Sequence, residues 1–222
     1  GWFGDSGDLE FSIEPWTGDP PDPDPDPGFG DYEESVWFEW GTTNLDVLVL
    51  GVDDPVLVAA IKEAVTAWQT GIGELAPAWL AEALRIRTHV ASDGTPPPGF
   101  APNIFFVPQG LFAVEPQERD PLACYAFAPA PSGDVLAPYG AAYAIAAHEF
   151  GHCLGLQHVF EDGLEYFPEF DIMGLGELPD GGKACPSNLN VLVLERVYGE
   201  LFGFSSGGSV TMDPGAYRQS SC

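Results

Sequence analysis

Several residue types are scarce in this chain of 222 residues, and each scarcity narrows what the protein can be. The chain has two lysines and seven basic residues in all, against 34 acidic residues, which gives a net charge of −27. Such a charge repels polyanions, so we expect no nucleic-acid partner. No run of eighteen or more apolar residues occurs, so we expect no transmembrane segment. Two explanations of this acidity remain open. It keeps the protein soluble, or the protein comes from a halophilic source that lives in high salt.

Histidine is also scarce, and three of the four copies lie in the string H-E-F-G-H-C-L-G-L-Q-H over 148–158. His148 and His152 are four residues apart, so on a helix both imidazoles point to the same side. Zinc binds neutral imidazole and is tetrahedral, so three protein ligands leave one position for water. The string therefore predicts a metal site, and the alternative is a helix that carries surface histidines by chance.

The other fixed positions of the string have chemical roles of their own. Glu149 follows the first ligand and can take a proton from a water at the open position. Gly155 permits a sharp turn, because glycine tolerates positive φ, and the turn brings His158 back as the third ligand. The remaining histidine, His89, shares a strand face with arginines, so we expect a solvated residue and not a ligand.

The pattern H-E-x-x-H-x-x-G-x-x-H resembles that of the metzincin superfamily of zinc endopeptidases. The sequence F-D-I-M-G over 170–174 is similar to the Met-turn of that superfamily, and Met173 follows the third histidine. Locally the string is closest to the matrixin branch, with three departures. Val159 stands where matrixins usually have serine, the segment between the third histidine and Met173 is longer, and the N-terminal part has no cysteine-switch motif.

The resemblance covers about residues 44–203 and implies an α+β fold. It places a catalytic domain at 35–222, with an upper subdomain to about residue 158 and a lower subdomain over 159–222. The upper subdomain is expected to hold a mixed twisted sheet, a backing helix and the active-site helix. The lower subdomain is expected to hold the Met-turn and one helix.

The resemblance also implies a function, a zinc-dependent endopeptidase with Glu149 as the general base. Met173 is expected to form the floor of the site without binding metal. Leu175 stands where some metzincins have a tyrosine ligand, so no such ligand is expected. A protein or peptide substrate would bind in extended form beside the strand at 122–128 of a monomer. The alternatives are a non-catalytic zinc-binding surface or adhesion module and a zinc amidase that acts on non-protein amides.

Hydrophobic patterning predicts the elements of the globular part. Asp54 and Pro55 are typical of a helix start, and Ser187 or Asn188 is a candidate cap for the last helix. The predicted strands lie at 35–40, 44–52, 84–91, 103–107 and 123–128, and the predicted helices at 55–70, 140–154 and 189–202.

Residues 1–34 form an acidic segment rich in proline and aspartate, which we interpret as a tether, a spacer or a pro-segment. Asp5 and Asp31 each end a Phe-Gly-Asp triplet. In some metzincins an aspartate of a similar motif keeps the enzyme latent by binding zinc, so both are candidate latency ligands, and ordinary acidic turns are the alternative. The acidic loop over 161–171 is either a Ca²⁺ site or solvated surface.

Four cysteines suit a secreted or surface-tethered protein with two disulfides, for which three pairings exist. We favour Cys185 with Cys222, which would hold the C-terminal tail. Cys124 with Cys153 would then join a strand to the active-site helix. Buried free thiols are the alternative. No C-x-x-C spacing occurs, so we expect no second zinc site.

Overall fold

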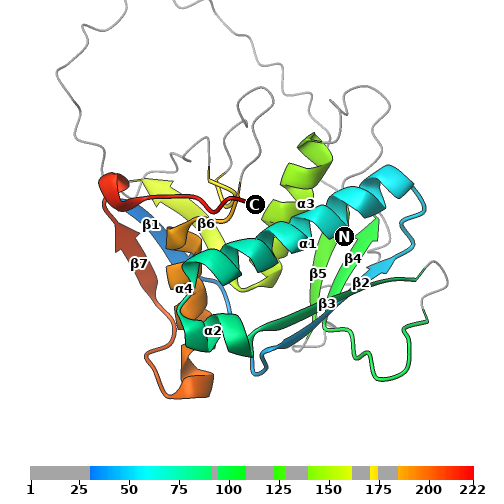
Figure 1. The fold of residues 1–222 in the computed structure, drawn as a ribbon, viewed down its shortest axis with the longest axis horizontal. Helices are drawn as coiled ribbons and strands as arrows, with labels where there is room; N and C mark the ends of the chain where they lie inside the picture. Colours follow the sequence, from blue (N-terminus) through cyan, green and yellow to red (C-terminus); the bar gives the residue numbers. More distant parts are fainter. Residues whose placement is uncertain (1–30, 92–94, 109–122, 129–139, 162–170, 175–184) are drawn as a thin grey trace, which may run out of the picture.

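The fold of this protein is α+β, with two β-sheets and four α-helices among the residues that the structure describes. A computed structural model describes residues 31–91, 95–108, 123–128, 140–161, 171–174 and 185–222 (Figure 1). Within these ranges no helix is both long and apolar enough to cross a membrane.

The larger sheet is parallel throughout. Its order is β3 (Arg85–Ala91), β2 (Asn44–Leu50), β4 (Ile104–Pro108) and β5 (Cys124–Ala128). Strand β2 is central, and its apolar residues are buried on both faces, as in a covered strand. The expectation of one mixed sheet was wrong for the described strands, because the antiparallel pairs belong to a second sheet. Strand β5 is the outermost described strand at one end of this sheet, in keeping with the edge position expected for 122–128.

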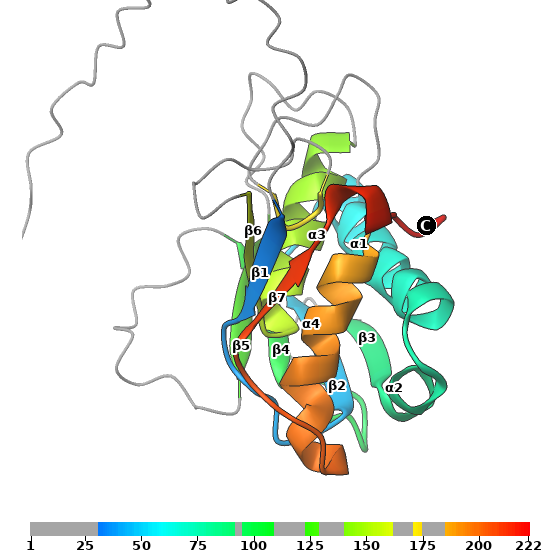
Figure 2. The same ribbon diagram turned by 90° about the vertical axis from the view of Figure 1, so that its left-hand side faces the viewer.

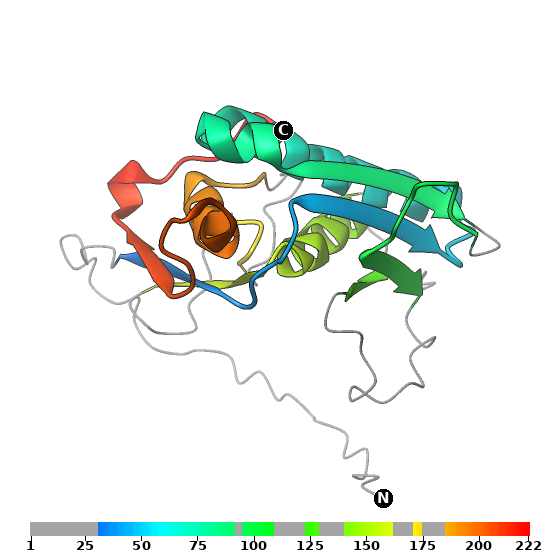
Figure 3. The ribbon, with the colours of Figure 1, turned by 90° about the horizontal axis from the view of Figure 1, so that it is seen from below.

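Helix α1 (Pro55–Leu75) confirms the prediction of a helix at 55–70 and extends it by five residues. Asp54 caps it by accepting a hydrogen bond from the Val56 amide, and proline occupies its first turn. Its apolar face is buried against α3 (Gly140–Cys153) and the sheet (Figure 3). The short helix α2 (Ala78–Ala83) follows.

The second sheet is antiparallel and consists of β6 (Leu156–Glu161), β1 (Tyr32–Val36) and β7 (Ser209–Met212), as Figure 2 shows. Sequence patterning missed β6 and β7. It placed the first strand at 35–40, whereas β1 ends at Val36. The acidic sequence Y-E-E-S-V looks like part of the N-terminal segment, yet Tyr32 and Glu34 are buried. The boundary expected after residue 34 therefore falls inside a strand, while the wider division into subdomains stays a prediction.

Helix α4 (Asn188–Gly199) packs on the second sheet and begins at a capping box formed by Ser187 and Asn190. Residues 200–202 of the helix predicted at 189–202 form the 3-10 helix η2 (Glu200–Phe202) instead. A further 3-10 turn, η3 (Pro214–Ala216), precedes the C-terminal tail.

Both favoured disulfide pairings are confirmed. Cys124–Cys153 joins strand β5 to the last residue of helix α3, and Cys185–Cys222 holds the C-terminal tail beside the start of α4. The described part of the chain contains no free cysteine. The first bridge fixes the end of the helix that carries two of the predicted metal ligands.

Candidate metal centre

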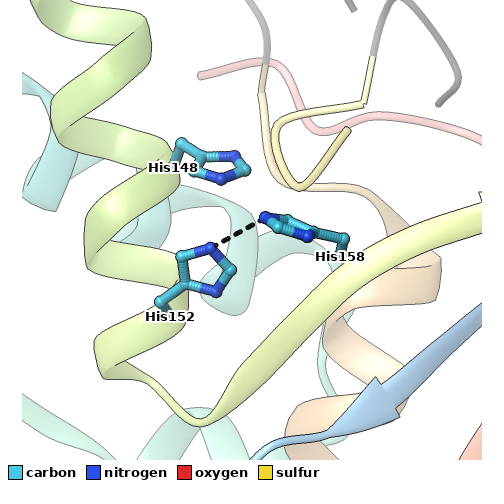
Figure 4. A group of neighbouring side chains, drawn as sticks. All are labelled: His148, His152 and His158. Carbon is cyan, nitrogen blue, oxygen red and sulfur yellow. Dashed lines mark hydrogen bonds between the residues drawn. The ribbon is translucent and has the colours of Figure 1, made fainter. Parts of the chain in front are cut away.

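The three histidines of the string come together at the junction of helix α3 and strand β6. His148 and His152 lie one turn apart on α3, and His158 lies on β6 and faces them (Figure 4). The chain passes from α3 to β6 through Gly155, whose φ is +102°. The predicted geometry of two helical ligands and a returning third is therefore present.

The imidazoles are close enough to share one ion. Nε2 of His152 lies 3.1 Å from Nε2 of His158, and one ring nitrogen from each of the three histidines lies within 4.8 Å of the other two. Two nitrogens bound tetrahedrally to zinc are about 3.3 Å apart, since each Zn–N bond is about 2.0–2.1 Å. Among the described residues, this is the only group of three or more candidate ligands.

Backbone carbonyls select the tautomer of the two helical histidines. Nδ1 of His148 lies 2.9 Å from the carbonyl oxygen of Ile172, and Nδ1 of His152 lies 2.9 Å from that of Leu156. A carbonyl oxygen only accepts, so in the neutral ring Nδ1 carries the hydrogen and Nε2 keeps its lone pair. Metal-bound histidines make this kind of outer hydrogen bond, so the donor set fits a metal ion.

Burial favours the neutral, metal-binding form of these rings. Desolvation lowers the pKa of His148, against the hydrogen bond to Ile172 and the charge of Asp171, which raise it. Desolvation likewise lowers the pKa of His152 to about 4. Both imidazoles are therefore neutral at pH 7, and no proton has to leave before a cation binds.

Glu149 is half-buried on α3, directly after the first histidine. Desolvation raises its pKa above the usual value for a glutamate. Its carboxylate is not part of the group of candidate ligands. A carboxylate whose pKa is raised by burial is a better proton acceptor than a solvated one, which suits an acid–base role and not a ligand role.

Met173 is fully buried and packs against Gly151, a glycine of the same string. A Cβ on Gly151 would lie 2.2 Å from Sδ of Met173 and 2.8 Å from Cζ2 of Trp68. Sequence reasoning treated Gly151 as a variable position. The signal that it overlooked is a glycine inside a helix, which usually has a packing reason.

Gly155 is needed both for its dihedral angle and for its size. A Cβ at this position would lie 2.6 Å from the carbonyl oxygen of Phe38 and 3.0 Å from Cγ1 of Val197. The Gly155 carbonyl also accepts a hydrogen bond from the Trp37 amide at 2.7 Å. The expected turn role of Gly155 therefore includes close contact with the segment that follows β1.

The turn over 171–174, which contains Met173, is held on both sides by hydrogen bonds. The Met173 amide donates to Oδ1 of Asp171 at 2.7 Å, and the Met173 carbonyl accepts from the Val159 amide at 3.1 Å. Val159 directly follows His158, so the turn is bonded to the strand that carries the third histidine. Sequence reasoning missed Asp171, although a residue two positions before a turn amide is a typical place for an aspartate cap.

Two tryptophans donate hydrogen bonds to backbone carbonyls of α3, one in the middle of the helix and one at its last residue. The indole Nε1 of Trp68 donates to the carbonyl of Ala147, the residue before the first histidine, at 2.8 Å. The indole of Trp40 donates to the carbonyl of Cys153 at 2.9 Å. Trp37 is exposed, and its ring meets the His152 ring edge-on with 5.1 Å between centroids.

The remaining predicted site residues lie elsewhere. Asp31, a candidate latency ligand, is exposed just before β1 and is not part of the histidine group. His89, which was expected to be a solvated residue and not a ligand, lies on β3 outside that group and is partly buried, with its ring against Phe100. Asp5, most of the acidic loop expected to bind calcium, and Leu175 lie outside the described residues.

Comparison of the chain with known proteins found no matching family model, no matching curated protein and no matching solved structure.

Proposed function

We propose that this protein is a zinc-dependent endopeptidase of the metzincin type. The observation that carries the proposal is the convergence of three imidazoles from one H-E-x-x-H-x-x-G-x-x-H string, with Glu149 beside the first of them in the sequence. Two disulfides support an exported or surface-tethered protein, because disulfides persist in oxidising compartments.

In this proposal the three histidines hold the ion through Nε2, and the Ile172 and Leu156 carbonyls orient the two helical rings. When bound, zinc supplies Lewis acidity, which makes water more acidic and polarises a carbonyl group. Glu149 takes the proton from the attacking water. It then delivers that proton to the leaving amine nitrogen as the C–N bond breaks, so the carboxylate is regenerated.

The substrate proposed is a protein or peptide in extended form. Strand β5 is the last described strand on its side of the parallel sheet, and Cys124–Cys153 joins it to the helix that carries His148 and His152. An extended peptide that pairs with such an edge would lie beside the metal centre.

The direct test replaces Glu149 by glutamine and compares cleavage of casein and of quenched fluorescent peptides. General acid–base groups contribute about 10²–10⁴ to rate, so cleavage by Glu149→Gln should fall by at least a hundredfold. Its zinc content should equal that of the wild type, because the amide retains the shape of the side chain and Glu149 is not a ligand.

The matched control is Glu82→Gln, the same chemical change on an exposed residue of α2, which should cleave at the wild-type rate. A chelator should abolish cleavage, and added zinc should restore it. Full activity of Glu149→Gln would refute its role as general base. Zinc binding without any hydrolysis would favour the non-catalytic module, and hydrolysis of small amides alone would favour an amidase.

A further inference from the structure

A buried polar cluster lies next to the Met-turn and joins three distant parts of the chain. Its two acidic members are Asp171 of the Met-turn, 4% exposed, and Glu34 of strand β1, 0% exposed. The other members come from the start of α4 and from the tail that follows η3; they are Ser187, Asn190 and Tyr217. The mechanism proposed above uses none of these side chains.

The carboxylate of Asp171 accepts four hydrogen bonds. Its donors are the Met173 amide at 2.7 Å, the Ser187 hydroxyl at 2.9 Å, the Tyr217 hydroxyl at 2.7 Å and the Asn190 amide group at 3.1 Å. A carboxylate has about four lone-pair sites, so this set satisfies the ionised form fully. Asp171 is therefore the member of the cluster that carries the negative charge.

The carboxyl group of Glu34, unlike that of Asp171, accepts a single hydrogen bond among the described residues. Oε2 accepts one hydrogen bond, from the Asn190 side chain at 2.9 Å, and Oε1 has no partner among the described residues. Burial, and then the charge of Asp171, raise the pKa of Glu34 well above its usual range. Two buried carboxylates so close together cannot both be ionised at low cost, so Glu34 is the protonated one.

The cluster reaches the metal centre through a single peptide unit. The peptide between Ile172 and Met173 is planar and trans, so its N–H and its C=O point in opposite directions. The N–H of this unit donates to Asp171, and the C=O of the same unit lies 2.9 Å from Nδ1 of His148. Because the peptide is rigid, a hydrogen bond that holds its N–H in place also fixes the direction of its C=O.

We propose that Asp171 is a positioning residue of the metal centre. By holding the N–H of the Ile172–Met173 peptide, its carboxylate aims the carbonyl at Nδ1 of His148 and leaves Nε2 facing the other imidazoles. Neutral Glu34 completes the cluster without adding a second charge. The inference rests on the metal site of the proposed function and concerns metal affinity, not turnover.

The test is the zinc dissociation constant of the purified, disulfide-bonded chain, measured by competition with a chromogenic chelator. Loss of an outer hydrogen-bond partner typically weakens metal binding 10–100-fold, and Asp171→Asn should show a loss of that size, because an amide offers one acceptor oxygen where the carboxylate offers two. Glu34→Gln imitates the neutral acid and should stay within about twofold of the wild type.

A second readout separates positioning from general loss of structure. Long-range ¹H–¹⁵N spectra of the metal-free protein report which nitrogen of His148 carries the hydrogen. The wild type and Glu34→Gln should show the Nδ1–H tautomer, and Asp171→Asn should show a mixture. Should Asp171→Asn fail to fold, Tyr217→Phe removes one donor from the same carboxylate and should weaken zinc binding in the same direction.

The matched control is Tyr198→Phe, which deletes a buried hydroxyl that makes no hydrogen bond among the described residues, and it should leave zinc affinity unchanged. Unaltered affinity and an unaltered tautomer in folded Asp171→Asn would overturn the positioning role. A loss in Glu34→Gln as large as in Asp171→Asn would overturn the neutral assignment of Glu34. A wild-type chain that binds no zinc would refute the proposed function itself.

Discussion

Replacement of Gly155 by alanine is the most informative single change, because this residue connects the helix with two ligands to the strand with the third. Its φ of +102° is strained for any residue with a Cβ, at about 1–3 kcal/mol. The added methyl would also lie 2.6 Å from a backbone oxygen of Phe38, which cannot rotate away, and 3.0 Å from Val197. Overpacking of this kind destabilises by about 1–3 kcal/mol.

The two contributions together predict that Gly155→Ala lowers the free energy of unfolding by about 2–6 kcal/mol. Urea titration followed by circular dichroism measures this quantity. With a slope of about 2 kcal/mol per molar urea, the midpoint of the urea titration should fall by roughly 1–3 M. Zinc affinity should fall as well, because relief of the contact moves His158 away from α3.

The matched control is Gly73→Ala on helix α1. Gly73 is exposed, and a Cβ built on it meets nothing within 4 Å, so alanine should stabilise the helix by about 0.5–1 kcal/mol. The free energy of unfolding should therefore fall for Gly155→Ala and rise for Gly73→Ala. A loss of less than about 1 kcal/mol for Gly155→Ala would refute the argument from dihedral strain and close contact.

Two further predictions concern the packing and the protonation of the site. Gly151→Ala should lower the free energy of unfolding by about 1–2 kcal/mol and weaken zinc binding, since the new methyl displaces Met173. A rise in the free energy of unfolding in urea titration, like that expected for Gly73→Ala, would contradict this prediction. Protonation of His152 should not weaken zinc binding between pH 7 and about 5, and should weaken it only below that range. The pKa of His152 is lowered to about 4, so its metal-binding neutral form is lost only as pH drops through that value. A steep loss that begins at pH 6.5 in chelator competition would indicate ordinary, solvated histidines.

The histidine site was predictable because its information is local. The spacing of His148 and His152 follows from the helical period, and Gly155 and His158 follow within six residues. The same holds for α1, whose start is encoded by Asp54 and Pro55, and for α4, whose cap is Ser187. Each of these features depends on residues that are neighbours in the sequence.

The second sheet and the buried cluster were not predictable, because their partners are far apart in the sequence. Glu34 and Asn190 are 156 residues apart, and nothing near Glu34 in the sequence indicates burial. Strand β6 was obscured because its residues 156–158 had already been assigned to the metal string. The close contact of Gly155 with Phe38 likewise depends on a segment more than a hundred residues away.

The central claim is that the imidazoles of His148, His152 and His158 bind one zinc ion, and zinc-edge X-ray absorption on the purified protein tests it most directly. We expect one zinc per chain, with three imidazole nitrogens at about 2.0–2.1 Å and no sulfur ligand. A protein that retains no zinc, or a spectrum with sulfur at about 2.3 Å, would contradict it.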